Sequence, residues 1–185
     1  MPTPASPSRV IVVDCGIAHA AGSEEAIHPT SRRCRDFLKS MRQVGHRLGW
    51  SSAVAEEWHR HRSAFASKWW VSMHARKKVV AVSAKEDSRL RDVLTKSSSK
   101  KTAREAMLKD AHLLEAAIAA EMRIASLDDT VRRLFAVAAQ QHKAIQRIVW
   151  VNPDGDFDSV VTWLEAGAVS EKSRWLVAYR PDDEV

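Results

Sequence analysis

The chain has 185 residues, a length that favours a single compact domain. Hydrophobic residues make up 45% of it and charged residues 28%, which is ordinary globular composition and excludes a wholly disordered chain. No apolar run approaches the roughly 18–20 residues that a membrane span needs. Residues 1–8 lack the charged and apolar regions of a signal peptide. We therefore expect a cytoplasmic protein with no membrane partner.

The charge of the chain is unevenly distributed. Its 29 Lys and Arg residues outnumber its 23 Asp and Glu residues, which gives a net charge of +6. Residues 30–109 hold 20 of the basic residues and 7 of the acidic ones, so 9 basic and 16 acidic residues remain outside this segment. A basic middle between acidic ends is typical of a polyanion-binding surface beside an acidic pocket, and equally of solvated helix faces.

Short apolar runs alternate along the chain with segments of helical periodicity. The first run, residues 9–14, is apolar nearly throughout, as in a central strand that is buried on both faces, and Gly16 and Gly22 are expected to break the pattern after it. Residues 97–101 are small and polar, which indicates a mobile loop. Strands are expected over residues 9–14, 47–50, 79–82, 123–128, 145–151 and 175–179. Helices are expected over residues 31–44, 51–76, 87–96, 102–121, 130–141 and 157–166.

The alternation of strands and helices predicts the fold class. It favours an α/β protein, a three-layer α/β/α sandwich in which helices cover both faces of a central parallel sheet. The sequence has no internal repeat and no credible domain boundary. We therefore expect one domain over residues 9–151, with residues 152–185 as a C-terminal elaboration packed on the same domain.

Two of the expected strands end in an aspartate, Asp14 and Asp128. In an open parallel sheet, ligands bind outside the carboxyl ends of the strands. If both strands are central, the two carboxylates lie near each other, and like charges at short range raise each other's pKa. A divalent cation removes this cost, and oxygen ligands from Asp and Glu suit Mg²⁺ or Mn²⁺.

Two helices contribute further acids to the expected site. Asp110 lies close to the inward stripe of its helix, where a carboxylate needs a partner. Only one of Glu56 and Glu57 can face the edge of the sheet, because neighbouring residues diverge by about 100° on a helix. Each acid also has a purely structural interpretation. Asp128 could cap a helix, and Asp14 could be a turn residue at the end of its strand. The helix dipole favours Glu56 or Glu57 in a first turn, and Asp110 could form an ion pair with Arg104.

Four short segments together form a more specific pattern than any single acid. They read Val12-Val13-Asp14, Ala55-Glu56-Glu57-Trp58, Lys109-Asp110-Ala111-His112-Leu113-Leu114-Glu115-Ala116-Ala117 and Ser126-Leu127-Asp128-Asp129. This combination resembles the motifs of the PIN-domain family of metal-dependent nucleases, over residues 9–150. The resemblance implies a PIN-like fold, in which Ser126 matches a small hydroxyl residue two positions before the last acid.

The resemblance also implies a function. In the family, three or four acids bind one or two Mg²⁺ or Mn²⁺ ions, and here these would be Asp14, Glu57, Asp110 and Asp128, with Glu56 as the alternative to Glu57. The implied activity is phosphodiester hydrolysis by an endoribonuclease, RNA being a more frequent substrate than DNA. Because many bacterial members are toxins or defence effectors, the implied partners are an antitoxin, a defence complex or a second copy of the chain, the last through tryptophans such as Trp163.

One segment departs from the family's pattern. Cys15 and Gly16 stand where the family often has Thr or Ser followed by Asn. Cys15 lacks the ordered His and Asn partners of a nucleophile, so we expect a small buried residue. The departure favours a second hypothesis, a catalytically inactive PIN-fold module that binds nucleic acid or another partner. A small-molecule α/β enzyme is not indicated, because the chain has no GxGxxG, P-loop or nucleophile-elbow motif.

An acidic pocket cannot attract a polyanion by itself, so a nuclease needs cations around it. The basic middle of the chain is expected to supply this rim. Trp69 and Trp70 are adjacent, so at most one faces the core squarely, and the other either packs against a helix or stacks on a base. The phosphate contacts are expected from Arg60, Arg62, Lys68, Arg76, Lys77 and Lys78.

Overall fold

A computed structural model describes residues 7–180 of the chain. Its strands form one five-stranded sheet in the order β3-β2-β1-β4-β5, and each neighbouring pair is parallel. The strands are β1 (Val10–Val13), β2 (Arg47–Trp50), β3 (Val79–Ala81), β4 (Arg123–Ala125) and β5 (Val149–Val151).

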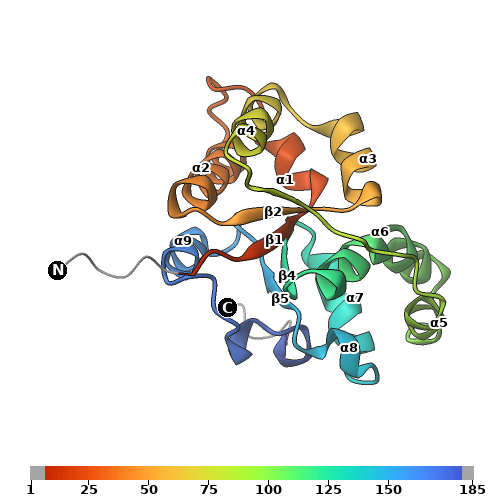
Figure 1. Cartoon of the computed structure of the whole chain (residues 1–185). Helices are drawn as coiled ribbons and strands as arrows, with labels where there is room; N and C mark the ends of the chain where they lie inside the picture. Colours follow the sequence, from red (N-terminus) through yellow and green to blue (C-terminus); the bar gives the residue numbers. More distant parts are fainter. Residues whose placement is uncertain (1–6, 181–185) are drawn as a thin grey trace.

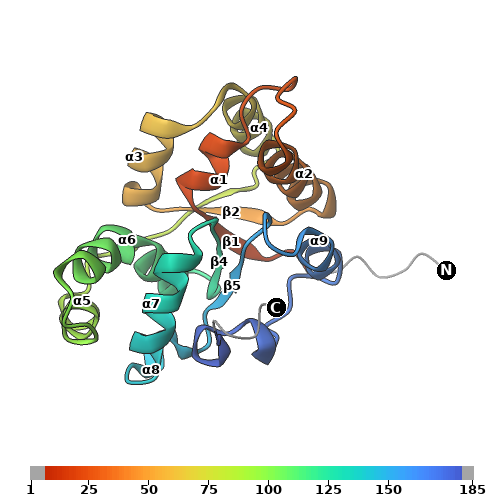
Figure 2. The ribbon, with the colours of Figure 1, turned by 180° about the vertical axis from the view of Figure 1, so that it is seen from behind.

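Helices cover both faces of this sheet (Figures 1 and 2), so the expected three-layer α/β/α architecture is confirmed. One layer holds α1 to α4 and α9, and the other holds α5 to α8. None of the helices within residues 7–180 is both long and apolar enough to cross a membrane. The helices are α1 (Cys15–Ala20), α2 (Pro29–Val44), α3 (Ser52–His61), α4 (Ala64–Ala75), α5 (Ser88–Lys96), α6 (Lys101–Ala119), α7 (Asp129–Ala139), α8 (Lys143–Gln146) and α9 (Phe157–Glu165).

The core is built around the central strand β1. Ile11, Val12 and Val13 have no exposed surface, because strands lie on both sides of β1 and helices on both of its faces. This is why the strand is apolar throughout rather than alternating. Trp58 of α3 packs over it, and its indole nitrogen donates to the Val13 carbonyl at 2.8 Å.

The helix expected over residues 51–76 is two helices, α3 and α4. The break lies at Arg62 and Ser63, which both have extended backbone conformations. Ser63 caps α4 by accepting a hydrogen bond from the Ala66 amide at 3.2 Å. The hydrophobic stripe runs on across the break because Trp58 and Trp69 both pack into the core, and this continuity conceals the break in the sequence pattern.

Other expected boundaries also differ from the structure. Gly16 does not break the pattern but lies within the short helix α1. Residues 143–146 form α8, so β5 is shorter than the strand expected over 145–151. The expected strand over 175–179 is a 3₁₀ turn, η2 (Leu176–Ala178), because Trp175 makes only a single antiparallel bridge with Val149.

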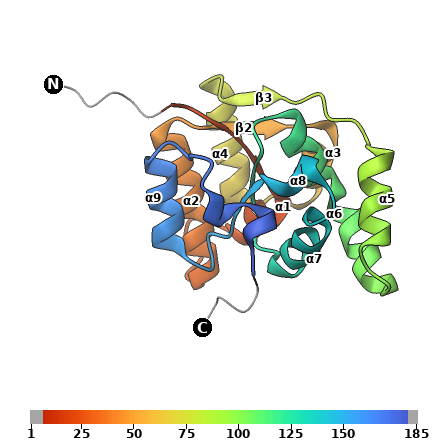
Figure 3. The same ribbon diagram turned by 90° about the horizontal axis from the view of Figure 1, so that it is seen from below.

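Residues 152–180 pack on the same sheet and helices as the rest of the chain. Helix α9 lies beside α2 (Figure 3), and the turns η1 (Lys172–Arg174) and η2 contact β5 and α7. Trp163 of α9 is 1% exposed and its indole donates to the Val169 carbonyl at 2.8 Å. Trp163 is therefore part of the core, and the expectation that it contributes to a dimer surface is wrong.

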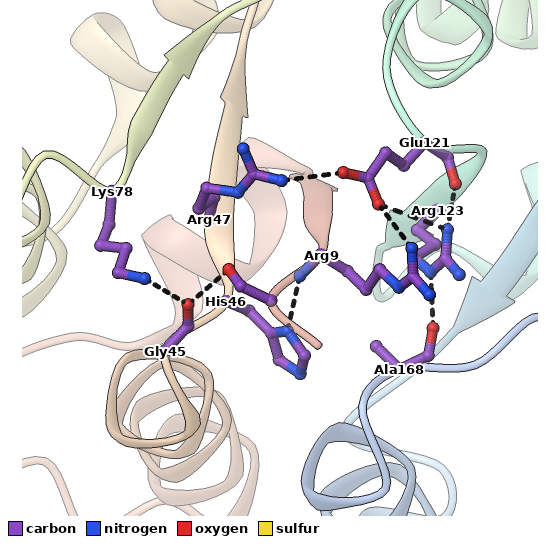
Figure 4. A network of polar contacts seen from close by, with 9 residues as sticks. Arg9, Gly45, His46, Arg47, Lys78, Glu121, Arg123 and Ala168 are labelled. Carbon is purple, nitrogen blue, oxygen red and sulfur yellow. Dashed lines mark hydrogen bonds and ion pairs between the residues drawn. The ribbon is translucent and has the colours of Figure 1, made fainter. Parts of the chain in front are cut away.

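His46 connects α9 to the sheet. This side chain is buried, and its Nδ1 accepts a hydrogen bond from the Arg9 amide at 3.1 Å (Figure 4). Its Nε2 lies 2.8 Å from the Leu164 carbonyl of α9, so the neutral imidazole with its proton on Nε2 satisfies both partners. Burial lowers the pKa of His46 below its ordinary value of 6.5, and the charges of Arg123, Lys78 and Arg9 lower it further.

This contact predicts an acid-sensitive fold. The unfolded chain binds a proton at His46 near pH 6.5, whereas the folded protein resists protonation to lower pH. His46 should therefore make the free energy of unfolding fall as the pH falls from about 7 toward 5, and the difference between the wild-type chain and His46→Gln in chemical denaturation measures this contribution. His46→Gln should lack it and should lower stability at pH 7 by roughly 1–3 kcal/mol. The matched control is His28→Gln, an exposed histidine, and an equal effect of both variants would refute the assignment to His46.

Candidate functional site

The four acids that the sequence indicates line one pocket. The pocket has a volume of about 540 Å³ and lies at the carboxyl edge of the sheet. Asp14 follows β1, Glu57 belongs to α3, Asp110 to α6, and Asp128 precedes α7. Its other lining residues are Cys15, Gly16, Lys109, Leu127, Asp129 and Thr130.

The topology of the sheet explains this convergence. The chain builds outward from β1 through β2 to β3 and then crosses back to β4, so the strand order reverses between β1 and β4. Such a reversal leaves a crevice outside the carboxyl ends of the two strands. Asp14 lies at this point, and its amide donates to the Ala125 carbonyl at 2.9 Å.

One buried hydroxyl positions two of the acids. Ser126 directly follows β4 and has no exposed surface. Its Oγ donates to Asp14 Oδ2 at 2.7 Å and accepts a hydrogen bond from the Asp128 amide at 3.1 Å. The Asp14 side chain caps no helix, although the residue stands at the N-cap of α1, so the hydroxyl rather than a cap orients this carboxylate.

The Cys15-Gly16 pair also acts on the acids. Cys15 is half-buried rather than fully buried as expected, and its Sγ donates to Glu57 Oε2 at 3.3 Å. Burial and the neighbouring Asp14 and Glu57 carboxylates raise the thiol pKa well above its ordinary value, so the thiol keeps the proton that it donates. A Cβ at Gly16 would stand 3.2 Å from Asp14 Oδ2, closer than most such contacts, so glycine leaves this carboxylate uncrowded.

The structure distinguishes Glu57 from Glu56. Glu57 lines the pocket, whereas Glu56 is exposed on another face of α3 and pairs with Arg60. Trp58, the next residue, is anchored on β1 through the Val13 carbonyl, and this anchor fixes the rotation of α3 so that Glu57 faces the pocket and Glu56 does not. That carbonyl immediately precedes Asp14, so the same anchor brings α3 and Glu57 to the end of β1.

Asp128 is a helix cap as well as a pocket residue. Its Oδ1 accepts a hydrogen bond from the Val131 amide at 2.8 Å and so caps α7. The carboxylate of its neighbour Asp129 has partners outside the pocket acids. Asn152 Nδ2 donates to Asp129 Oδ2 at 2.7 Å, and Arg132 lies 3.8 Å from the other oxygen, Oδ1. The structural interpretation of Asp128 is therefore correct and does not exclude a second role.

Asp110 is the electrostatically strained member of the group. Its pKa is raised from 3.8 to about 6, chiefly by burial and also by the charges of Asp14 and Asp128, while Lys109 and His112 act in the opposite direction. The ion pair with Arg104 that the sequence allows is not formed, because Arg104 instead donates to the backbone carbonyls of residues 98 and 99.

The pocket has the donor chemistry of a hard-cation site but not a closed ligand set. Carboxylate oxygens are the ligands that Mg²⁺ and Mn²⁺ prefer. The pKa of Asp110 is raised chiefly by burial and then by the neighbouring carboxylates, and a nearby cation would offset both effects. Among residues 7–180, however, no three His, Cys, Asp or Glu side chains lie close enough together to hold a metal ion. The carboxylates would have to rotate toward one another to coordinate one.

Three of the expected phosphate contacts lie far from the pocket. Arg76, Lys77 and Lys78 come directly before β3, at the amino end of a parallel strand, while the pocket lies at the carboxyl edge. The Lys78 amine donates to the Gly45 carbonyl at 2.8 Å. The expected rim around the pocket therefore does not include these residues.

The other three expected contacts lie on α3, on α4 and at the break between them. Arg60 is paired with Glu56, and the Arg62 guanidinium lies 5.1 Å from the centre of the Trp70 ring. Lys68 is exposed. The cation that does line the pocket is Lys109, which sequence analysis did not single out, although its position next to Asp110 was a signal for it.

Comparison of the chain with family models, with curated proteins and with solved structures found no match.

The raised pKa of Asp110 predicts that this carboxylate destabilises the fold at neutral pH. The folded protein holds the proton more tightly than the unfolded chain, so stability is lost as the pH rises from 3.8 through about 6. Asp110→Asn should raise the free energy of unfolding at pH 7 by on the order of 1 kcal/mol, measured by chemical denaturation. Glu105→Gln, an exposed acid on the same helix, is the matched control, and an unchanged stability of Asp110→Asn contradicts the prediction.

Proposed function

We propose that this protein is a nuclease that depends on Mg²⁺ or Mn²⁺ and hydrolyses the phosphodiester bonds of RNA. The observation that carries the proposal is the convergence of four acids from four separate elements on one pocket where the strand order reverses. In sequence these acids are up to 114 residues apart, since they extend from Asp14 to Asp128. Ordinary capping or surface ion pairs do not require such convergence.

A divalent cation bound here would lower the pKa of a bound water and neutralise charge on the scissile phosphate. The chain's own groups prepare the site for it. Ser126 orients Asp14, and the Cys15 thiol orients Glu57. The carboxylates of these acids and of Asp110 and Asp128 present the oxygen ligands.

One cation of the pocket suits a phosphate. Lys109 lines it next to the acids. The N-terminus of α7 also borders the pocket, but its partial positive charge is already used by the Asp128 carboxylate that caps it. A phosphodiester can therefore approach the acids with part of its charge balanced by Lys109.

The resemblance to the PIN-domain family supports the same proposal. It extends the proposal to a cytoplasmic endoribonuclease that acts as a toxin or defence effector, with an antitoxin, a defence complex or a second copy of the chain as its partner. These finer points rest on the resemblance alone.

A catalytically inactive nucleic-acid-binding module of the same fold is the second candidate. The spacing of the carboxylates favours it, because no three of them within residues 7–180 form a ready metal site. Its expected behaviour differs from that of a nuclease in one respect: it binds nucleic acid equally well with and without divalent metal and cleaves none.

Removing single acids tests the proposal. Asp14→Asn, Asp110→Asn and Asp128→Asn should each lower the rate of RNA cleavage with Mn²⁺ by at least about 100-fold, because losing a metal ligand costs more than the 10–100-fold typical of outer partners. Cleavage of a labelled RNA, followed on a gel, measures this. Glu57→Gln should behave in the same way.

The matched control is Glu56→Gln, which changes the neighbouring exposed acid and should retain full activity. Chelation with EDTA should abolish cleavage. Cleavage that persists in EDTA, or in all of the aspartate variants, would show that the pocket is not the catalytic site. Binding without cleavage under every condition would favour the inactive module.

The buried Ser126 hydroxyl gives a second test. Ser126→Ala removes the hydrogen bond that orients the Asp14 carboxylate and the bond that the Asp128 backbone amide donates. We expect the apparent Mn²⁺ affinity in the cleavage assay to fall by about 10–100-fold. The control is Ser67→Ala, which removes a hydroxyl that donates to the carbonyl of Ser63, the N-cap of α4. If the two variants depended on Mn²⁺ equally, Ser126 would have no role in positioning the metal ligands.

A further inference from the structure

A cation stands at the amino end of each of the first four strands. Arg9 directly precedes β1, Arg47 begins β2, Lys78 directly precedes β3 and Arg123 begins β4. Because all the strands are parallel, these four residues lie along one edge of the sheet (Figure 4), opposite the edge that carries the acidic pocket. The sheet is therefore polarised, with acids at its carboxyl edge and cations at its amino edge.

Three of these cations share one carboxylate as a partner. Glu121 contacts the guanidinium of Arg47 at 3.0 Å, that of Arg9 at 3.7 Å and that of Arg123 at 4.0 Å. Burial and the charge of Arg9 lower the pKa of Arg123. The buried Nε atoms of Arg9 and Arg47 have no hydrogen-bond partner within residues 7–180.

A basic pocket opens beside these strand ends. It has a volume of about 430 Å³ and is lined by Lys39, Arg42, Gln43 and Arg76. Arg42 lies in the last turn of α2, which leads into β2, and Arg76 is the C-cap of α4, which leads into β3. The pocket therefore belongs to the same edge of the sheet as the strand-end cations.

Two arginines of this pocket are held by one hydroxyl. Ser72 Oγ accepts from Arg42 Nη1 at 3.2 Å and from Arg76 Nε at 3.4 Å. Within residues 7–180 neither arginine forms an ion pair, and Lys39 forms only a long one, at 3.9 Å, with Asp36. Holding two guanidiniums together without a carboxylate is unfavourable unless an anion joins them.

The positions of these arginines at helix ends do not explain the pocket. A helix C-terminus carries about half a negative charge. This accounts for one cation at the end of α2 and one at the end of α4, but not for a pocket that three cations line. The lining contains no apolar side chain, whereas the centre of a protein–protein interface is depleted in charge and enriched in aromatic groups. Interfaces with nucleic acid are instead polar, strongly positive and hydrated.

We propose that this basic pocket binds phosphates of a nucleic-acid backbone, at the edge of the sheet opposite the acidic pocket. Lys77, which is exposed and lies next to Arg76 and Lys78, extends the contact surface. Phosphate contacts carry no sequence information, so RNA and DNA of the same length should bind alike. The inference does not depend on the proposed nuclease activity, because it holds equally for an inactive binding module.

The test compares two double variants of the whole chain that lose the same charge. Arg42→Gln with Arg76→Gln changes the basic pocket, and Lys96→Gln with Lys101→Gln changes two exposed lysines on α5 and α6. The probe is a fluorescently labelled RNA of mixed sequence and about 20 nucleotides, longer than the roughly 4–16 that one binding fold covers. Binding is followed by fluorescence anisotropy in EDTA at several salt concentrations.

The arginine variant should bind the RNA at least about tenfold more weakly, because it loses two charged contacts to phosphates. The slope of log affinity against log salt should become shallower by about 1.4, from about 0.7 for each of two phosphates. The lysine variant should change affinity less than about threefold. A DNA probe of the same sequence should give the same pattern.

Equal effects of the two double variants would overturn the proposal. It would also be overturned if polyglutamate bound more tightly than RNA and lost more affinity in the arginine variant, since the ligand would then be an acidic protein. Should the arginine variant melt at a lower temperature, Arg76→Gln alone, at an exposed position, should still show about half of the slope change. Asp110→Asn should bind RNA normally in EDTA, because the acidic pocket does not take part in this binding. A failure of the nuclease proposal can therefore be told apart from a failure of this one.

Discussion

The parallel pairing of β1 with β4 at the centre of the sheet determines where the charged groups of this protein lie. Val13 pairs with Ala125, so the residues that follow the two strands emerge side by side. Asp14, Ser126 and Asp128 are therefore neighbours, although more than 100 residues separate the first from the other two in sequence. Helices α3 and α6 then add one acid each to a position that the two strands have already defined.

Neutral donors hold two of the acids in the pocket. Hydrogen bonds to the charged form offset part of the cost of bringing carboxylates together. Ser126 supplies one such bond to Asp14, and Cys15 supplies one to Glu57. The pKa of Asp110 is raised chiefly by burial and also by Asp14 and Asp128, and Lys109 offsets only part of this. The charged form of Asp110 is therefore a cost to the stability of the fold.

The opposite edge of the sheet has the opposite charge for a related reason. Parallel strands bring all their amino ends together, as they bring their carboxyl ends together. A cation at the start of each of four strands thus becomes a continuous basic edge, with Glu121 as a shared partner and the pocket of Arg42 and Arg76 beside it. The two functions that we propose therefore belong to opposite edges of one sheet, phosphodiester hydrolysis at the carboxyl edge and phosphate binding at the amino edge.

Much of this protein was predictable from its sequence, because hydrophobic periodicity and residue type are local properties. The apolar runs predicted the five strands of the sheet, together with a sixth over residues 175–179 that is a 3₁₀ turn. Asp14 and Asp128 were predicted at strand ends, Asp110 near an inward helix stripe and Glu57 from the resemblance, and these four acids line one pocket. The break between α3 and α4 was missed because its apolar stripe continues across it. The roles of Cys15 and Lys109 were missed because they depend on neighbours from other elements.

Only the tertiary structure decided which edge of the sheet each charged residue occupies. The sequence identified the basic segment but assigned all of it to the surroundings of the acids. Arg76, Lys77 and Lys78 belong to the other edge because they precede a strand, whereas the acids follow strands. Charge and hydrophobic periodicity can be read along a chain, because they depend on residue type and spacing. The edge of a parallel sheet at which a residue lies depends instead on how the strands are paired.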